Sequence, residues 1–135
     1  MIEFDHSRYP LVISTTRDAF TAGDAIVYED TINSLYARDE RFSLVSLASG
    51  VKIPNPRVIR RLGAWLRDTR DLRRQYVIAT GIYLDAPVLR NVLSFLNSLA
   101  PSPVPQELFA TPDEAIAYAQ RMLHLEAAPP QSRTG

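Results

Sequence analysis

The sequence predicts a single α/β domain in which a mostly parallel sheet of four or five strands carries four helices. Its 135 residues match the usual size of one domain, and its 46% hydrophobic and 22% charged residues are ordinary globular usage. Short apolar runs alternate with longer segments whose apolar residues recur at helical spacing. The run over residues 76–84 is almost continuously apolar, which is typical of a central strand. Strands that alternate with helices favour parallel pairing through right-handed crossovers.

The first half of the chain contains three predicted strands and one helix. Residues 2–5 are expected to form an edge strand, and residues 10–16 and 42–48 two buried strands, because each is a short run rich in apolar or β-branched side chains. The helix between the two buried strands begins near Thr21 or Asp24, since either side chain can cap it.

An arginine-rich helix is predicted after the second buried strand. Asn55 is a good N-cap and is followed by a proline that suits the first helical position. The helix is expected to continue in one piece to about residue 73, with Leu72 as the last member of its apolar stripe.

The remainder of the chain predicts one more helix, one edge strand and a last helix. Asp85 is expected to cap the first of these helices, which has a proline in its first turn. Residues 104–109 form the strand, and the proline within them favours an edge position. Thr111 and Glu114 make a capping box that begins the last helix.

These elements place the domain at residues 1–126 and leave residues 127–135 as a flexible tail. The N-terminus has no basic stretch followed by an apolar region, and no apolar run approaches the roughly 20 residues that span a bilayer. The absence of cysteine excludes disulfides, thiolate catalysis and cysteine metal sites. We therefore expect a cytoplasmic protein without a transmembrane segment.

No motif in the sequence indicates an enzyme. The five glycines form neither a dinucleotide-binding fingerprint nor a phosphate-binding loop, and no serine lies in a nucleophile elbow. The two histidines, His6 and His124, lie near opposite ends of the chain. We expect no catalytic set, no metal and no cofactor.

The charge is unevenly distributed along a chain whose net charge is zero. Residues 52–74 contain eight cations and two acids, a net charge of +6, which leaves −6 for the rest. In one continuous helix, four arginines share the outward face: Arg60, Arg67, Arg70 and Arg74. This face is either a solvated surface paired with acids elsewhere or an interaction surface for an acidic protein or a second copy. Nucleic acid is not expected, because the overall charge is zero and the sequence pI is about 6.7.

Read from end to end, the pattern resembles the SpoIIAA-like and STAS-like superfamily of small α/β modules in bacterial signalling, which is related in fold to the CRAL-TRIO domain. The resemblance rests on PLVISTT, FSLVSLAS, YVIATGIYL and the final LFATPDEAIAYAQRML. It implies a non-enzymatic protein-interaction, signalling or regulatory module. The serine turn that is phosphorylated in anti-sigma-factor antagonists has no full counterpart, since Ser49-Gly50 lacks the preceding aspartate.

The alternative function is a small-molecule or lipid-binding carrier, with lipid the less favoured ligand. In α/β proteins, ligands bind at the carboxyl ends of parallel strands. The loops predicted there carry four candidate ligand-binding residues: Asp18, Ser49, Lys52 and Asp85.

Overall fold

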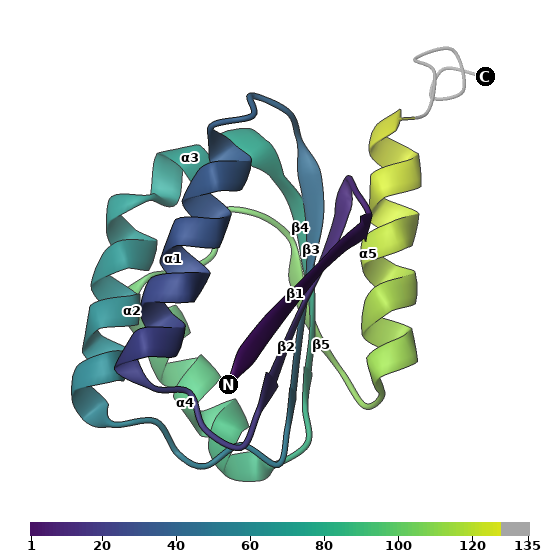
Figure 1. Ribbon diagram of the computed structural model, residues 1–135. Coiled ribbons are helices and arrows are strands. Elements are labelled where there is room, and N and C mark those ends of the chain that lie inside the picture. Colours follow the sequence, from purple (N-terminus) through teal and green to yellow (C-terminus); the bar gives the residue numbers. More distant parts are fainter. Residues whose placement is uncertain (128–135) are drawn as a thin grey trace.

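The computed structural model describes residues 1–127 and consists of one sheet between two helical layers (Figure 1). The elements follow one another along the chain as β1 (Ile2–Arg8), β2 (Leu11–Arg17), α1 (Ala22–Tyr36), β3 (Phe42–Ser49), α2 (Pro56–Asp68), α3 (Arg70–Tyr76), β4 (Val77–Leu84), α4 (Pro87–Leu99), β5 (Gln106–Phe109) and α5 (Pro112–Ala127). The predicted α/β class is confirmed. The predicted tail falls on Ala127, which ends α5, and on residues 128–135, which lie outside the described residues.

The five strands lie in the order β1-β2-β3-β4-β5, with β1 antiparallel to β2 and every other pair parallel. The strands predicted at the edges, β1 and β5, occupy the edges.

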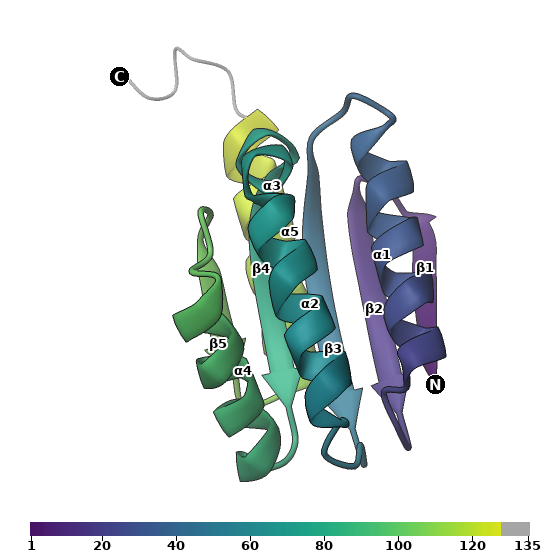
Figure 2. The same cartoon turned by 90° about the vertical axis from the view of Figure 1, so that its left-hand side faces the viewer.

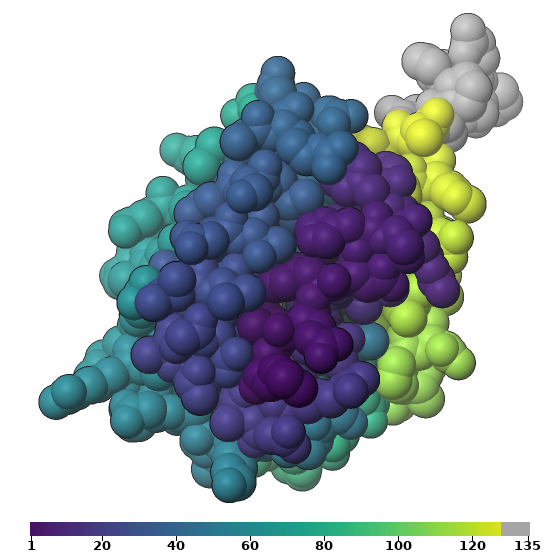
Figure 3. Space-filling model, in the orientation of Figure 1, coloured from purple at the N-terminus to yellow at the C-terminus, as the bar shows by residue number. Residues whose placement is uncertain are grey.

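The crossovers between successive parallel strands all have the same hand, which brings α1 to α4 onto one face of the sheet. Figure 2 shows α1, α2 and α4 side by side on that face. We call this the four-helix face. In the space-filling view, β1 fills the surface between α1 and α5 (Figure 3).

The opposite face, which α5 alone covers, is closely packed. Ala115 and Ala119 are fully buried against the sheet because their small side chains let the helix approach the strands. A Cβ atom added to Gly81 of β4 would lie 3.0 Å from the carbonyl carbon of Ala115 and would overlap its oxygen. Glycine at this position therefore sets the distance between α5 and the centre of the sheet.

The largest hydrophobic core lies on the four-helix face, at the end of the sheet where β3 and β4 begin. Val12, Phe42 and Val77 are almost completely buried there, beneath Ile32 and Tyr36 of α1. The rings of Tyr36 and Phe42 lie 6.1 Å apart. This core anchors the carboxyl half of α1 to the middle of the sheet.

The segment predicted as one arginine-rich helix breaks at Thr69, so the described residues contain five helices rather than four. The backbone N–H and the hydroxyl of Thr69 both donate to the carbonyl of Trp65, at 2.9 and 2.8 Å. Threonine hydroxyls that bond to the preceding turn bend helices, and here α2 ends and α3 begins. The prediction that Leu72 belongs to the apolar stripe was wrong. Its side chain is exposed, whereas Arg73, which helical spacing places closer to Leu62, is half-buried.

The predicted helix starts were right at Thr21 and Asn55 and wrong at Asp85. Thr21 forms a capping box with Asp24, and the Asn55 side chain accepts the N–H of Arg57. Helix α4 has Ala86 as its N-cap without a side-chain hydrogen bond. Asp85 does not cap that helix because its carboxylate accepts a hydrogen bond from the Gly50 N–H instead, at 2.7 Å.

We expect the substitution Gly81→Ala to destabilise the fold by about 1–3 kcal/mol, because the added methyl group overlaps the α5 backbone, which cannot move alone. Urea denaturation of both proteins measures the change in the free energy of unfolding. The control is Gly23→Ala in the first turn of α1, where the added methyl group would lie 3.6 Å from its nearest neighbour. This substitution should stabilise the helix by up to about 1 kcal/mol, because alanine has the higher helix propensity. Equal stability of Gly81→Ala and the unmodified protein would contradict the close packing.

Candidate functional site

A cavity of about 210 Å³ that is partly open to solvent lies between the four-helix face of the sheet and the helices that cover it. Each of the five strands contributes to its lining on one side, and α1, α2, α3 and α4 contribute on the other. Most of the lining side chains are apolar, among them Leu62 on α2 and Leu93 on α4. Largely apolar cavities with a few polar groups are typical of small-molecule sites.

The floor of the cavity is made of small side chains on the two middle strands. Ser14 and Thr16 of β2 lie beside Ser46 and Ala48 of β3 in the parallel register. The Ser14 hydroxyl donates to the carbonyl of Val45 at 3.3 Å. Small residues at inward positions leave space that larger aliphatic side chains would fill. The cavity therefore follows directly from the composition of these two strands.

Helix α2 forms the roof of the cavity. Its backbone lies close to those of α1, α3 and α4, and its inward side chains Leu62, Trp65 and Leu66 stay half-buried because they border the cavity. The ring of Trp65 meets the ring of Tyr28 edge-on, with 5.6 Å between their centroids. The indole N–H of Trp65 is buried and has no hydrogen-bond partner within residues 1–127.

One end of the cavity, where β4 begins, carries its most polar groups. Arg73 of α3 and two tyrosines of α1, Tyr28 and Tyr36, line this end. Burial raises the pKa of Tyr28 to about 12, although the nearby positive charge of Arg73 opposes the shift. Burial also raises the pKa of Tyr36, and the positive charge of Arg73 opposes that shift as well. The guanidinium group is therefore near enough to both phenol groups for its charge to act on them.

A surface depression of about 450 Å³ adjoins the other end of the cavity. Two residues, Phe20 before α1 and Pro54 before α2, line both the depression and the cavity. Lys52 and Arg57 also line the depression. Phe20 and Pro54 therefore lie where the cavity and the depression meet.

The structure brings the four predicted loop residues together at the carboxyl edge of the sheet. The Lys52 N–H donates to the carbonyl of Asp18 at 3.0 Å, which ties the loop before α1 to the loop before α2. The Ser49 hydroxyl donates to the Asp85 carboxylate at 3.4 Å. Each of the four is exposed, outside the cavity lining. Ligand binding by these residues stays a prediction.

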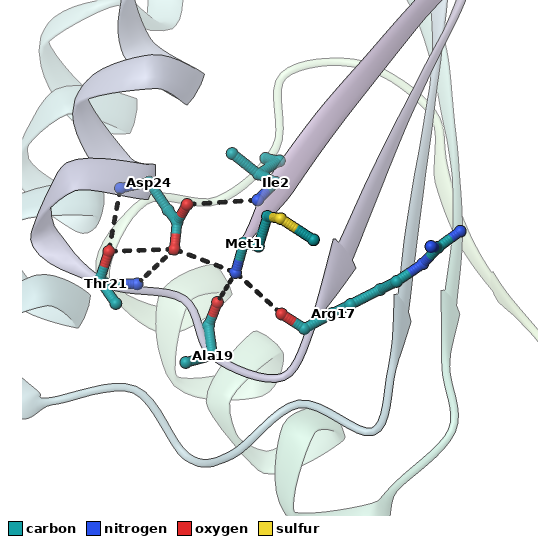
Figure 4. Close-up of polar contacts among 6 residues, drawn as sticks. All are labelled: Met1, Ile2, Arg17, Ala19, Thr21 and Asp24. Carbon is teal, nitrogen blue, oxygen red and sulfur yellow. Dashed lines mark hydrogen bonds and ion pairs between the residues drawn. The ribbon is translucent and has the colours of Figure 1, made fainter.

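The carboxylate of Asp24, near the same edge, binds groups of the protein itself. It accepts hydrogen bonds from the N–H groups of Thr21 and Ile2, at 2.9 and 3.2 Å, and forms an ion pair with the ammonium group of Met1 (Figure 4). That ammonium group also donates to the carbonyls of Arg17 and Ala19. Burial acts to raise the pKa of Asp24, but the hydrogen bonds from Thr21 and the ammonium group hold it below the usual value.

The four predicted interface arginines are divided between α2 and α3. Arg60 and Arg67 are exposed on α2 and take part in no ion pair within residues 1–127. Arg70 donates to the backbone carbonyl that follows α4, at 2.9 Å, and Arg74 lies 3.8 Å from the carboxylate of Asp71. Of the four predicted arginines, Arg60 and Arg67 are therefore the ones available to an external partner.

Within the described part of the chain, no group of three or more histidine, cysteine or acidic residues could hold a metal ion. No helix there is long and apolar enough to cross a bilayer. The arrangement around the cavity can enclose an apolar molecule and offer it hydroxyl groups and one guanidinium group.

Sequence reasoning missed the cavity and Arg73. A signal for the cavity was available in the strands. Ser14, Ser46 and Ala48 are small residues at inward positions of strands that are otherwise rich in large apolar residues. Arg73 also had a signal, because helical spacing brings it to within about 20° of Leu62, on the inward side of the predicted helix.

The fold has a counterpart among solved structures. The crystal structure of an uncharacterized protein from the DUF3478 family with a SpoIIAA-like fold, from Shewanella loihica PV-4, is similar over 88% of this chain and 92% of that one. The TM-score is 0.59 and the sequence identity is 11%, so the likeness concerns the fold. It confirms the predicted resemblance to SpoIIAA-like domains. No family model and no curated protein matches the sequence.

The raised pKa of Tyr28 predicts a loss of stability in alkali. The folded protein keeps this proton up to about pH 12 and the unfolded chain only to about pH 10, so the stabilising contribution is complete below pH 10 and is lost as the pH rises through 12. At about pH 11 we expect a loss of about 1.4 kcal/mol that is absent in Tyr28→Phe. Urea denaturation of both proteins at about pH 8 and pH 11 measures it. Equal losses in the two proteins would show that Tyr28 is open to solvent.

Proposed function

We propose that the chain is a non-enzymatic binding module that holds a small, largely apolar molecule in the cavity beneath its four helices. The cavity of about 210 Å³ carries this proposal. For scale, an engineered apolar cavity of about 150 Å³ in another protein binds benzene. The space lies beneath four helices and beside a surface depression, so a ligand could enter past Phe20 and Pro54 without unfolding the sheet. The SpoIIAA-like fold of an uncharacterized protein is compatible with a binding role and does not identify the ligand.

The lone tryptophan of the chain gives a direct readout of this proposal. Trp65 borders the cavity, so a bound molecule should change its fluorescence. We expect saturable binding of 1-octanol to the unmodified protein, together with a higher melting temperature, because a ligand that binds only the folded state stabilises it.

Filling the cavity should abolish that binding. The substitution Ala48→Leu adds a larger side chain to the cavity floor, and we expect it to weaken octanol binding at least about tenfold while stabilising the fold by up to about 2 kcal/mol. The matched control is Ala117→Leu, an exposed position on α5 across the sheet, which should bind as the unmodified protein does. Undiminished binding to Ala48→Leu would place the ligand elsewhere and overturn the proposal.

A second candidate function is interaction with another protein through α2, in a cytoplasmic setting. A separate observation supports it. Arg60 and Arg67 are exposed without an ion-pair partner in the described part of the chain. Residues 52–74 carry a net charge of +6 and the rest of the chain −6, so the charges of two copies of the chain can complement one another. We infer a weak homodimer in which this face meets an acidic surface of the partner, as in a regulatory or signalling module.

Charge reversal tests the dimer. We expect native mass spectrometry at low ionic strength to detect a dimer that moderate salt dissociates, because salt screens exposed charges. The double variant Arg60→Glu/Arg67→Glu should raise the dimer dissociation constant at least about tenfold. The control is Arg90→Glu on α4, an exposed arginine outside the basic segment. A strictly monomeric protein at low salt, or a dimer indifferent to the double variant, would exclude this interface.

A further inference from the structure

One charged side chain borders the cavity. Among the lining residues that the structure describes, Arg73 alone is charged, and it lies at the end where β4 begins. The remaining polar side chains of the lining are uncharged hydroxyl, indole and amide groups. The cavity therefore has a long apolar part and a single cationic end.

Arg73 has no counter-ion within the part of the chain that the structure describes. The ion pairs formed by arginines there belong to four other side chains: Arg38, Arg41, Arg61 and Arg74. The side chain of Arg73 is half-buried, whereas Arg74 beside it is exposed. A charge removed from water is normally paired, because desolvation without a partner is costly. A ligand with one negative charge would satisfy this requirement.

Two phenol groups line the same cavity as the guanidinium group. They belong to Tyr28 and Tyr36, and the positive charge of Arg73 acts to lower the pKa of both. A carboxylate accepts several hydrogen bonds and matches the planar fork of arginine. A single unpaired cation balances one negative charge, which favours a carboxylate over a phosphate dianion.

The size of the cavity limits the rest of the ligand. If about 150 Å³ accommodates the six carbons of benzene, the same scaling gives this cavity room for roughly eight or nine non-hydrogen atoms. The lining includes Val77 and Leu84, at opposite ends of β4, so a short unbranched chain can lie along this strand.

We propose that the ligand is a medium-chain monocarboxylate whose carboxylate pairs with Arg73 and whose apolar chain extends along β4 toward Phe20 and Pro54. This inference rests on the proposed function, because it assigns the chemical class of the molecule that the cavity holds. The Tyr28 hydroxyl donates the second hydrogen bond to the carboxylate.

The test compares heptanoate with 1-octanol at neutral pH, where heptanoate is ionised, through the fluorescence of Trp65; the two compounds have the same number of non-hydrogen atoms. We expect the unmodified protein to bind heptanoate at least about tenfold more tightly than octanol, since a hydrogen bond to a charged group contributes that much. In Arg73→Gln this preference should disappear while octanol binding is retained. The matched control is Arg74→Gln, which removes an exposed arginine of the same helix and should keep the preference. Arg73→Lys, which keeps the positive charge, should keep part of the preference for the carboxylate.

The other outcomes overturn the inference in distinguishable ways. Equal binding of heptanoate and octanol by the unmodified protein would show an apolar site that does not distinguish charge, and the proposed function would survive. A preference that persists in Arg73→Gln and disappears in Lys52→Gln/Arg57→Gln would place the carboxylate in the surface depression instead. Absence of binding of either compound would count against the proposed function itself. Circular dichroism and thermal melting of each variant verify that it folds.

Discussion

Consecutive strand order, combined with crossovers of one hand, forces four helices onto the same face of a five-stranded sheet. The sheet has limited width, and α1, α2 and α4 must share it. Helix α2 lies over the middle strands and takes its close backbone neighbours from the other helices. Beneath it the strands present small side chains, so the layer is not filled. On the opposite face, α5 has the sheet to itself and packs against Gly81 at contact distance. The contrast between a tight face and a hollow face follows from topology together with side-chain size.

The basic segment is divided between the inside and the outside of the molecule. In one straight helix, Arg73 would lie near the centre of the apolar stripe, because eleven residues at about 100° each bring it back to within about 20° of Leu62. Leu72 would lie at the edge of that stripe. In the structure Leu72 is exposed and Arg73 borders the cavity, whereas Arg60 and Arg67 are exposed on α2. The arginines therefore divide by helix face into one beside the cavity and two that are open to a partner.

The two proposed functions share a structural element. Helix α2 contributes Leu62 and Trp65 to the roof of the cavity and Arg60 and Arg67 to the outer surface. A ligand beneath the helix would gain contacts with its inward side chains and restrict its motion relative to the sheet. A partner on the outside would then meet a more rigid arginine surface, and binding at the two sites would be linked reciprocally. This connection would explain why a small module keeps an incompletely filled core.

The sequence by itself determined the class of the fold, the edge positions of β1 and β5, and the helix starts at Thr21 and Asn55. Each of these depends on local composition or on a capping side chain that acts within a few residues. It also brought Asp18, Ser49, Lys52 and Asp85 to one edge, because the carboxyl ends of parallel strands meet there. Only the tertiary structure decided that Asp85 binds the Gly50 N–H, that the arginine-rich helix breaks, and that a cavity remains above Ser46 and Ala48. These features depend on distances between segments far apart in the chain and on the volume left between packed layers, which periodicity along a single segment does not encode.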